Sequence, residues 1–308
     1  MDLSVVIPTC NRPQFAVRAV VSVLEQTLLP DEILVVENGS GDETEQALRE
    51  LRPVSVPLRY LVEPRPGVSR ARNLGTAEAA GKLVAFLDDD SVASPEWLEA
   101  LVGAASAPGV VAVAGRIALR WPCARPPWVT GLEGFYGSLD FGRERLELRY
   151  PRFPYASNMA ADRTSLLSLG GFPPGLGRRG KSLLSNEEDG LFRRAADHGW
   201  LVVYEPRALV YHWVHVERLS RRWLVRRGFV QGRSDVLSEA LFTHARTSRE
   251  RLHRSRRALA AARTAWLEGS GSASASARRL AQASTKLGAA FEELRLVLDP
   301  ARARDGQS

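Results

Sequence analysis

Three adjacent carboxylates, Asp88, Asp89 and Asp90, are the residues of this chain whose types and spacing most directly indicate chemistry. They follow the apolar run 83–87, which is typical of a buried strand in a parallel sheet. Open α/β sheets bind ligands at the carboxyl ends of their strands. Neighbouring negative charges repel one another unless a cation lies among them, and such oxygen-rich sites suit Mg²⁺ or Mn²⁺ shared with phosphates. The alternative is a solvated acidic turn that caps the next helix.

Two further residue pairs stand at the ends of two other predicted strands. They are Pro8-Thr9 and Glu37-Asn38, and all but Pro8 have polar side chains. Because the two strands are expected to be neighbours, a planar base could fit between their ends. The alternative role of Glu37 is that of a turn carboxylate, since Asn38-Gly39 forms a turn in either case.

A helix with small side chains and two cations is predicted to begin near residue 67. The cations are Arg70 and Arg72. The amino end of a helix and nearby arginines together favour a diphosphate. Alternatively, one of these arginines pairs with the acid cluster and has only a structural role.

The rest of the chain must supply the elements that bring these residues together. Over the first 119 residues, apolar runs alternate with helical patterns, which is typical of βαβ units around a parallel sheet. The predicted strands are 3–7, 33–36, 58–62, 83–87 and 110–118. Residues 120–155 are irregular and rich in proline and aromatic residues, and two last strands are predicted at 201–204 and 208–211.

The composition changes after residue 215. Arginine-rich helices are predicted at 218–241 and 249–267, followed by a flexible linker at 269–276 and a final helix at 277–298. The net charge of the chain is +7, and the segment from Val216 to Arg263 contains thirteen arginines and four acidic residues. Such a segment attracts an anionic partner, which can be a membrane surface, a lipid phosphate, an acidic polymer or a nucleic acid.

The 308 residues have the composition of an ordinary globular protein. Two cysteines, Cys10 and Cys123, imply no disulfide framework and are consistent with a reducing cytosol. We expect no signal peptide before the first strand, and no apolar stretch approaches the ~20 residues of a membrane-spanning helix. The expected location is the cytoplasm, or the periphery of the inner face of the membrane.

The chain lacks the G-x-G-x-x-G, G-x-x-x-x-G-K-[ST] and G-x-S-x-G motifs of dinucleotide-binding proteins, P-loop proteins and serine hydrolases. Four other segments occur in order: V-I-P-T-x-N-R at 6–12, V-V-E-N-G-S at 35–40, G-V-S-R-A-R-N-L-G at 67–75 and F-L-D-D-D at 86–90. In this order and spacing they resemble the family 2 glycosyltransferases of the GT-A fold, which use nucleotide sugars and typically invert the anomeric centre. The resemblance extends from about residue 2 to residue 233.

The resemblance implies an α/β protein with the GT-A fold, in which a Rossmann-like, mostly parallel central sheet is followed by a C-terminal α-helical appendage. The expected domains are a catalytic domain over 1–215 and a basic helical region over 216–308. Within the catalytic domain, the resemblance assigns about 1–119 to nucleotide binding and 120–215 to the acceptor.

On the donor side, the resemblance implies a nucleotide site that includes Pro8, Thr9, Arg12, Glu37, Asn38, Arg72 and Asn73. It places Asp88 near the ribose and Asp90 on a divalent metal, Mn²⁺ or Mg²⁺. Asp89 has either of these roles or positions its neighbours. His212 matches a histidine that reaches the metal or the diphosphate, and a purely structural histidine is the alternative.

On the acceptor side, the resemblance places the catalytic base, which takes the proton of the acceptor hydroxyl group, in the segment 186–193. Two registers remain open. If Leu191 is aligned with the leucine of the family's motif, Glu188 is the base. If Glu188-Asp189 is aligned with the family's Glu-Asp pair, Asp189 is the base, and we prefer this register slightly. The alternative for either acid is stabilisation of the helix dipole. Asn158 matches a segment on the acceptor side, and a turn residue is its alternative.

The expected activity is the metal-dependent, inverting transfer of a sugar from a nucleoside diphosphate-sugar to a hydroxyl group of a saccharide, a lipid-linked glycan or a small-molecule scaffold. The basic helices are expected to contact a membrane surface peripherally or to cover the catalytic domain or form a homodimer, and no nucleic acid is expected. One rival is a sugar-phosphate nucleotidyltransferase, which needs a glycine-rich loop after the first strand. The other is a non-catalytic basic binding or scaffold protein.

Overall fold

The computed structural model describes residues 2–39, 42–51, 55–149, 152–180, 182–242, 246–267 and 272–303. The chain divides into two compact units, and each consists of three segments. The first unit is Met1–Ala118, Ser138–Phe172 and Leu191–Trp213, and the second is Leu119–Gly137, Pro173–Gly190 and Val214–Ser308. Two loops that precede residue 215 thus belong with the C-terminal helices, and the domain boundary expected at 215–216 stays a prediction.

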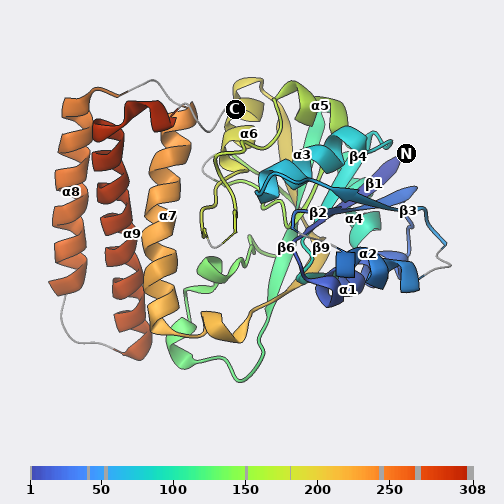
Figure 1. Cartoon of the computed structure of the whole chain (residues 1–308), viewed down its shortest axis with the longest axis horizontal. Helices are drawn as coiled ribbons and strands as arrows, with labels where there is room; N and C mark the ends of the chain where they lie inside the picture. The colour runs from blue at the N-terminus through green and yellow to red at the C-terminus, as the bar shows by residue number, and fades with distance from the viewer. Residues whose placement is uncertain are drawn as a thin grey trace. The chain divides into compact units, whose positions relative to one another are not determined.

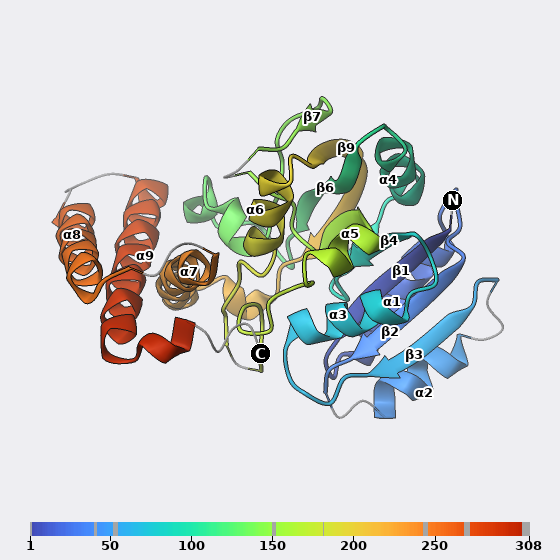
Figure 2. The ribbon, with the colours of Figure 1, turned by 90° about the horizontal axis from the view of Figure 1, so that it is seen from above.

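A β-sheet forms the centre of the first unit (Figures 1 and 2). Its parallel half has the order β3-β2-β1-β4 and consists of β1 (Leu3–Thr9), β2 (Glu32–Glu37), β3 (Leu58–Val62) and β4 (Leu83–Leu87). Strands β1, β2 and β4 are buried along their whole length, in keeping with their apolar sequences. Thr9 pairs with Glu37 in the register of β1 and β2, so the ends of these two strands lie side by side.

The other half of the sheet contains pairings that a simple βαβ repeat does not give. Strand β8 (Asn158–Asp162) runs antiparallel between β4 and β6 (Val110–Arg120). Strand β9 (Leu201–Trp213) pairs with two short strands that were not predicted, β5 (Ser91–Ala93) and β7 (Leu146–Glu147). The pairing of β5 with β9 has functional importance because β5 directly follows Asp90.

The prediction of two strands at 201–204 and 208–211 is wrong, because β9 is continuous over this range. The intervening Glu205-Pro206-Arg207 has the composition of a turn. Glu205 is nevertheless buried in the strand because Arg145 lies 2.6 Å and Arg207 3.2 Å from its carboxylate oxygens, which compensates its charge.

The helices before β9 are α1 (Pro13–Leu24), α2 (Asp42–Glu50), α3 (Val68–Glu78), α4 (Trp97–Ala105), α5 (Arg163–Ser168) and α6 (Asp189–Asp197). The sequence predicts these helices at about 13–26, 42–52, 68–80, 95–105, 163–169 and 186–198, and the observed bounds differ from the predicted ones by at most three residues.

The second unit contains three long helices, α7 (Arg221–Phe242), α8 (Ser248–Leu267) and α9 (Ala273–Leu298). Helix α9 packs against both α7 and α8 (Figures 1 and 2). Glycines allow a very close approach of α7 and α9. A Cβ atom at Gly232 would lie 1.8 Å from the carbonyl oxygen of Thr285, and one at Gly288 would lie 1.8 Å from that of Phe229.

Helix α9 begins earlier than predicted, because Ser272 caps it by accepting a hydrogen bond from the backbone N–H of Ala275 at 3.2 Å. Residues 273–276 of the predicted linker are therefore helical, and 269–271 lie outside the described residues. Short 3₁₀ helices also occur in this unit: Pro127–Val129, Glu133–Tyr136, Val216–Arg218 and Pro300–Ala303. Over the described ranges, no helix combines the length and hydropathy that spanning a membrane requires.

Candidate active site

The three carboxylates lie in the turn between β4 and β5, at the carboxyl end of β4. The backbone N–H of Ser91 donates to the carbonyl oxygen of Asp88 at 3.0 Å and closes this turn. The side chains of Asp89 and Asp90 are almost completely buried, whereas that of Asp88 is 26% exposed. The turn therefore offers one acid to solvent and keeps two within the protein.

The loop after β1 contacts the two buried acids. The hydroxyl group of Thr9 donates to Asp89 Oδ2 at 2.7 Å. The guanidinium group of Arg12 bridges the acids, with Nη2 3.2 Å from Asp89 Oδ1 and Nη1 3.1 Å from Asp90 Oδ2. Although burial alone would lower the pKa of Arg12, the neighbouring carboxylates raise it, so this arginine stays charged.

Arg72 of α3 binds the third acid, with Nη2 2.8 Å from Asp88 Oδ1. Its guanidinium group is buried and lies over the ring of Phe172, 5.6 Å from the ring centroid. The sequence left open that an arginine of this helix pairs with the acid cluster, and Arg72 does so in the structure. Such a pair does not exclude a diphosphate contact, since Arg72 has five N–H donors in total.

Strand pairing brings His212 to the acid cluster. Ser91 and His212 are partners in the β5–β9 register, and the backbone N–H of Trp213 donates to the carbonyl oxygen of Asp90 at 2.9 Å. His212 Nδ1 consequently lies 3.1 Å from Asp90 Oδ1 and 3.4 Å from Ser91 Oγ. The two residues expected to bind a metal, 122 positions apart in the sequence, are neighbours in the structure.

The donor set fits a divalent metal that is shared with a ligand. Asp90 and His212 provide a carboxylate and an imidazole, and Mg²⁺ and Mn²⁺ sites typically combine few protein ligands with phosphate oxygens. Within the described residues, no group of three or more His, Cys, Asp or Glu side chains could hold a metal ion by itself. Oxygen atoms of a diphosphate and of water would add further ligands.

The acid cluster brings three carboxyl groups close together. Its three carboxylates contact two arginines, Arg12 and Arg72, besides the histidine. Burial raises the pKa of Asp89 to about 7, although the charge of Arg12 and the hydrogen bond from Thr9 act in the opposite direction. A cation at this position would relieve the repulsion, as the sequence predicts for three adjacent acids.

The predicted nucleobase contacts, Glu37 and Asn38, hold neighbouring loops in this structure. Glu37 is completely buried, and its two carboxylate oxygens accept from the Asn11 backbone N–H at 3.0 Å and from the Thr44 hydroxyl at 2.7 Å. The amide group of Asn38 donates to two carbonyl oxygens of the 63–67 loop and accepts from the N–H of Gly67. The base contact of either residue stays a prediction, and their observed role is to shape the loops after β1 and β2.

Two asparagines from the predicted site have similar supporting roles. Asn73 exchanges two hydrogen bonds of 2.8 Å with the backbone of Phe172. Asn158 is completely buried, accepts from Trp97 Nε1 at 2.7 Å and donates to two backbone carbonyl oxygens at 2.8 Å. This burial favours a structural role for Asn158, and its acceptor contact stays a prediction without support from the geometry. Pro8 is likewise buried, within β1.

The two candidate bases belong to the second unit. Glu188 and Asp189 are both buried, and Asp189 is the first residue of α6. The Ser238 hydroxyl of α7 donates a short hydrogen bond to Asp189 Oδ2. Ser238 lies outside residues 1–215, the range expected for the catalytic domain, and yet it binds one of the two candidate bases.

A polar stripe on α7 binds the segment directly before the candidate bases. The stripe consists of Arg227, Gln231, Ser234, Asp235 and Ser238, whose spacing places them on one side of the helix. Its members contact residues 183–189 at distances that include 3.1 Å between Ser185 N and Ser234 Oγ and 2.9 Å between Asn186 Nδ2 and Asp235 Oδ1. Sequence reasoning missed this stripe, although polar residues at helical spacing are its signal.

Comparisons with known proteins agree with the predicted family. The family model "Glycosyl transferase family 2" matches residues 4–166. A glucosyl-dolichyl phosphate glucuronosyltransferase of Haloferax volcanii is 29% identical over 256 residues, which are 80% of each chain. The succinoglycan biosynthesis protein ExoM of Rhizobium meliloti is 27% identical over 264 residues, 84% of this chain and 79% of the relative.

Solved structures have the same fold. The mannosyltransferase PcManGT from Pyrobaculum calidifontis, solved with GDP-Man and Mn²⁺, has a TM-score of 0.60 at 19% identity and matches 97% of this chain and 87% of its own. GalNAc-T7, solved with UDP, GalNAc and Mn²⁺, has a TM-score of 0.55 at 19% identity, and this chain spans 50% of its length. The expected GT-A fold, with its mostly parallel sheet and helical C-terminal part, is confirmed.

Proposed function

Because this chain belongs to glycosyl transferase family 2 and is a glycosyltransferase, we propose that it transfers a sugar from a nucleoside diphosphate-sugar to an acceptor hydroxyl group with inversion. The observation that carries the proposal is the convergence of Asp90 and His212 beside the carboxylates of Asp88 and Asp89. Family membership argues against both rivals, the sugar-phosphate nucleotidyltransferase and the non-catalytic basic protein.

On the donor side, Asp90 and His212 would hold Mn²⁺ or Mg²⁺. When bound, the metal supplies positive charge that stabilises the departing diphosphate. Arg12 and Arg72 add fixed positive charge at the same strand ends. Asp88, the most exposed of the three acids, is available to accept a hydrogen bond from a ribose hydroxyl group.

On the acceptor side, Asp189, or Glu188 in the other register, would accept the proton of the acceptor hydroxyl group. The acceptor oxygen then forms its bond to the anomeric carbon while the bond from that carbon to the diphosphate oxygen breaks. Attack on the face opposite the leaving group inverts the anomeric centre. The Ser238 hydrogen bond supports Asp189 as the base, since it fixes the orientation of that carboxylate.

The acceptor is proposed to be a saccharide, a lipid-linked glycan or a small-molecule scaffold. One relative carries dolichyl phosphate in its name, which makes a lipid-linked acceptor the first class to test. A homodimer and a cytoplasmic location stay predictions.

The proposal is tested with a panel of nucleotide sugars, each with Mn²⁺, with Mg²⁺ or with a chelator. We expect one base and sugar to raise the thermal unfolding temperature only with metal and to release nucleoside diphosphate slowly without acceptor. Asp90→Ala should abolish this metal-dependent donor binding, while Asp140→Ala, in an exposed ion pair with Arg116, is the matched control. Absence of any nucleotide affinity, with or without divalent ions, would refute the proposal.

A further inference from the structure

Helix α8 carries an exposed apolar row that its own packing does not use. Leu252, Leu259 and Trp266 are spaced by seven residues, about two helical turns, and so lie on one side of the helix. They are 39%, 45% and 69% exposed. The buried residues of α8 form the strip beside this row and are Arg251, Ser255 and Ala262.

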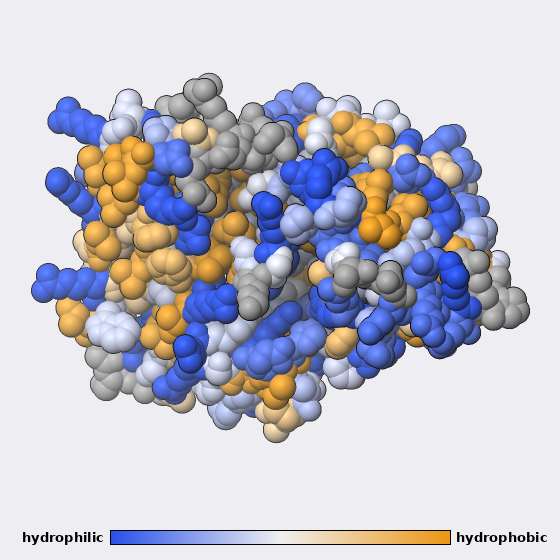
Figure 3. Space-filling model, viewed as in Figure 1, coloured by the Kyte–Doolittle hydropathy of each residue, from blue (hydrophilic) through white to orange (hydrophobic). Residues whose placement is uncertain are grey.

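Helix α9, which packs against α8, has a second exposed apolar row. Its members follow the helical period and are Leu287, Phe291, Leu294 and Leu298. Figure 3 shows hydrophobic residues gathered over α8 and α9 on one side of the second unit, with hydrophilic side chains that project along the outer edge of α8. We call these seven residues, from Leu252 to Leu298, the α8–α9 face.

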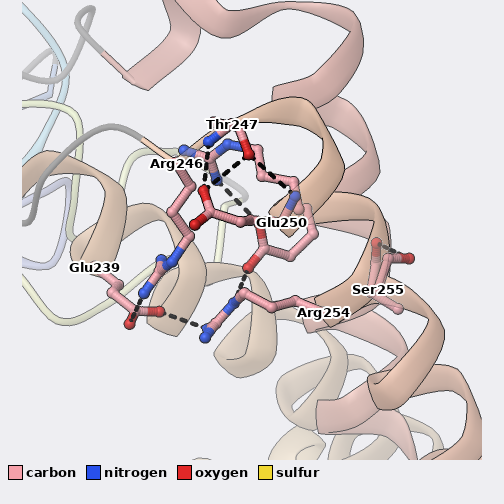
Figure 4. Close-up of polar contacts among 9 residues, drawn as sticks. Glu239, Arg246, Thr247, Glu250, Arg254 and Ser255 are labelled. Atoms are coloured by element: carbon pink, nitrogen blue, oxygen red, sulfur yellow. Dashed lines mark hydrogen bonds and ion pairs between the residues drawn. The ribbon is translucent and has the colours of Figure 1, made fainter.

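A row of arginines flanks the α8–α9 face. Arg249, Arg256 and Arg263 are exposed and again seven residues apart, and none of them has an ion-pair partner in the part of the chain that the structure describes. Other arginines of α8 have such partners: Arg251 and Arg254 lie 2.9 Å and 2.5 Å from carboxylate oxygens of Glu293. The polar cluster in Figure 4, which includes Arg254, therefore holds the helices together and leaves the outer row of arginines for another partner.

We propose that the α8–α9 face docks on the surface of an anionic lipid bilayer. Apolar side chains beside a row of arginines are the pattern of a helix that lies in the membrane interface, where the arginines meet lipid phosphates. Trp266 suits the same interface. In a dimer of two α8–α9 faces, Glu292 and Glu293 of α9 would not pair with the arginine row of the other copy, because both are buried in ion pairs.

The test is flotation of the full-length protein with two kinds of vesicle, phosphatidylcholine alone and phosphatidylcholine with phosphatidylglycerol. We expect binding to the anionic vesicles that weakens as salt is raised. The double variant Leu252→Ser/Leu259→Ser should reduce the bound fraction at least about tenfold. The matched control Leu29→Ser/Leu167→Ser changes two leucines of the first unit that are both 43% exposed, and it should bind as the unchanged protein does.

The arginine row is tested separately by Arg256→Gln/Arg263→Gln, which should lower binding about tenfold on anionic vesicles. The control Arg143→Gln/Arg179→Gln removes the same charge from two other exposed arginines and should change little. Release of nucleoside diphosphate from a soluble donor should be the same in all four variants, which separates this proposal from the proposed function. Equal binding to both vesicles, no binding, or a dimer that Leu252→Ser/Leu259→Ser dissociates would each overturn the proposal.

Discussion

Two regions of this glycosyltransferase combine acidic residues with arginines, and they differ in whether carboxylates or arginines are more numerous. In the helical unit, the carboxylates of Glu239, Glu292 and Glu293 contact the arginines Arg233, Arg246, Arg251, Arg254 and Arg295 (Figure 4 shows part of this cluster). In the acid cluster after β4, three carboxylates contact two arginines and a histidine. Among the described residues, arginines outnumber carboxylates in the helical cluster, and carboxylates outnumber arginines after β4. We interpret the first region as a structural network and propose that a cation joins the second.

The largest expected effect is the loss of kcat on replacement of the catalytic base, because no residue of the helical cluster is proposed to take part in the reaction. Asp189→Asn should lower kcat roughly 10²–10⁴-fold with little change in donor affinity, because a general base contributes about that much. Glu188→Gln tests the other register, and the variant that loses turnover identifies the base. Glu187→Gln is the control, as this acid is expected only to stabilise the helix dipole. Full activity of both Asp189→Asn and Glu188→Gln would remove the base from this segment.

The second prediction tests the helical cluster as a structural network. Glu293→Ala leaves Arg251 and the partly exposed Arg254 without their shared carboxylate, so the free energy of unfolding should fall by about 3–5 kcal/mol in urea titrations. Glu45→Ala breaks an exposed pair with Arg49 and should change stability by less than about 0.5 kcal/mol. Donor binding should survive in the folded fraction of Glu293→Ala. Loss of donor affinity without loss of stability would contradict the comparison.

The third prediction concerns Ser238, which we interpret as a positioning residue for Asp189. Ser238→Ala removes one hydrogen bond and should lower kcat about fivefold, the equivalent of about 1 kcal/mol, while KM for the donor is unchanged. Ser238→Thr keeps a hydroxyl group at this position and should restore kcat. Ser234→Ala, on the same stripe, removes a hydroxyl group that bonds to Val230 and Ser185, and it should leave both kcat and KM for the donor unchanged.

The smallest effect is expected from Glu32, a buried acid far in sequence from both clusters. Burial would raise its pKa, but hydrogen bonds from the Ala80 N–H, the Ser4 hydroxyl and Arg59 together lower it below 4.5. A lowered folded pKa stabilises the protein above pH 4.5, and this contribution is lost as the pH falls through the folded value. Glu32→Gln should therefore lower stability near pH 7 by at most about 1 kcal/mol and should not differ from the unchanged protein in strong acid. Unfolding curves across pH, with Glu96→Gln as control, measure this difference.

The sequence predicted the parallel half of the sheet well, because its buried strands are continuous apolar runs. It missed β5, which has three residues and no pattern of its own, and it divided β9 at a buried, ion-paired Glu205. Both errors have the same origin. Strand β5 forms because it pairs with β9, and β9 continues through Glu205 because Arg145 compensates its charge. Both contacts join residues distant in sequence, so they cannot be recognised from the local composition.

For the site, the sequence indicated the residue types more reliably than their roles. Asp90 and His212 are neighbours because Asp90 directly precedes β5, which pairs with β9 at His212, and their binding of a metal stays a prediction. Glu37, Asn38 and Asn158 were expected to face ligands. In the structure their side chains bind backbone, hydroxyl or indole groups of other segments. A polar residue in a conspicuous motif looks the same in sequence whether it faces a ligand or fixes a loop.

The glycine contacts between α7 and α9 have a mechanical consequence. Gly232 and Gly288 each lie directly against the backbone of the opposing helix, and no space for a side chain is left between the two helices there. Helix α9 therefore cannot shift without displacing α7. The polar stripe of α7 binds the segment that ends in Asp189. A displacement of α8 and α9, such as adsorption to a surface would cause, would therefore move α7 and change the orientation of the Asp189 carboxylate.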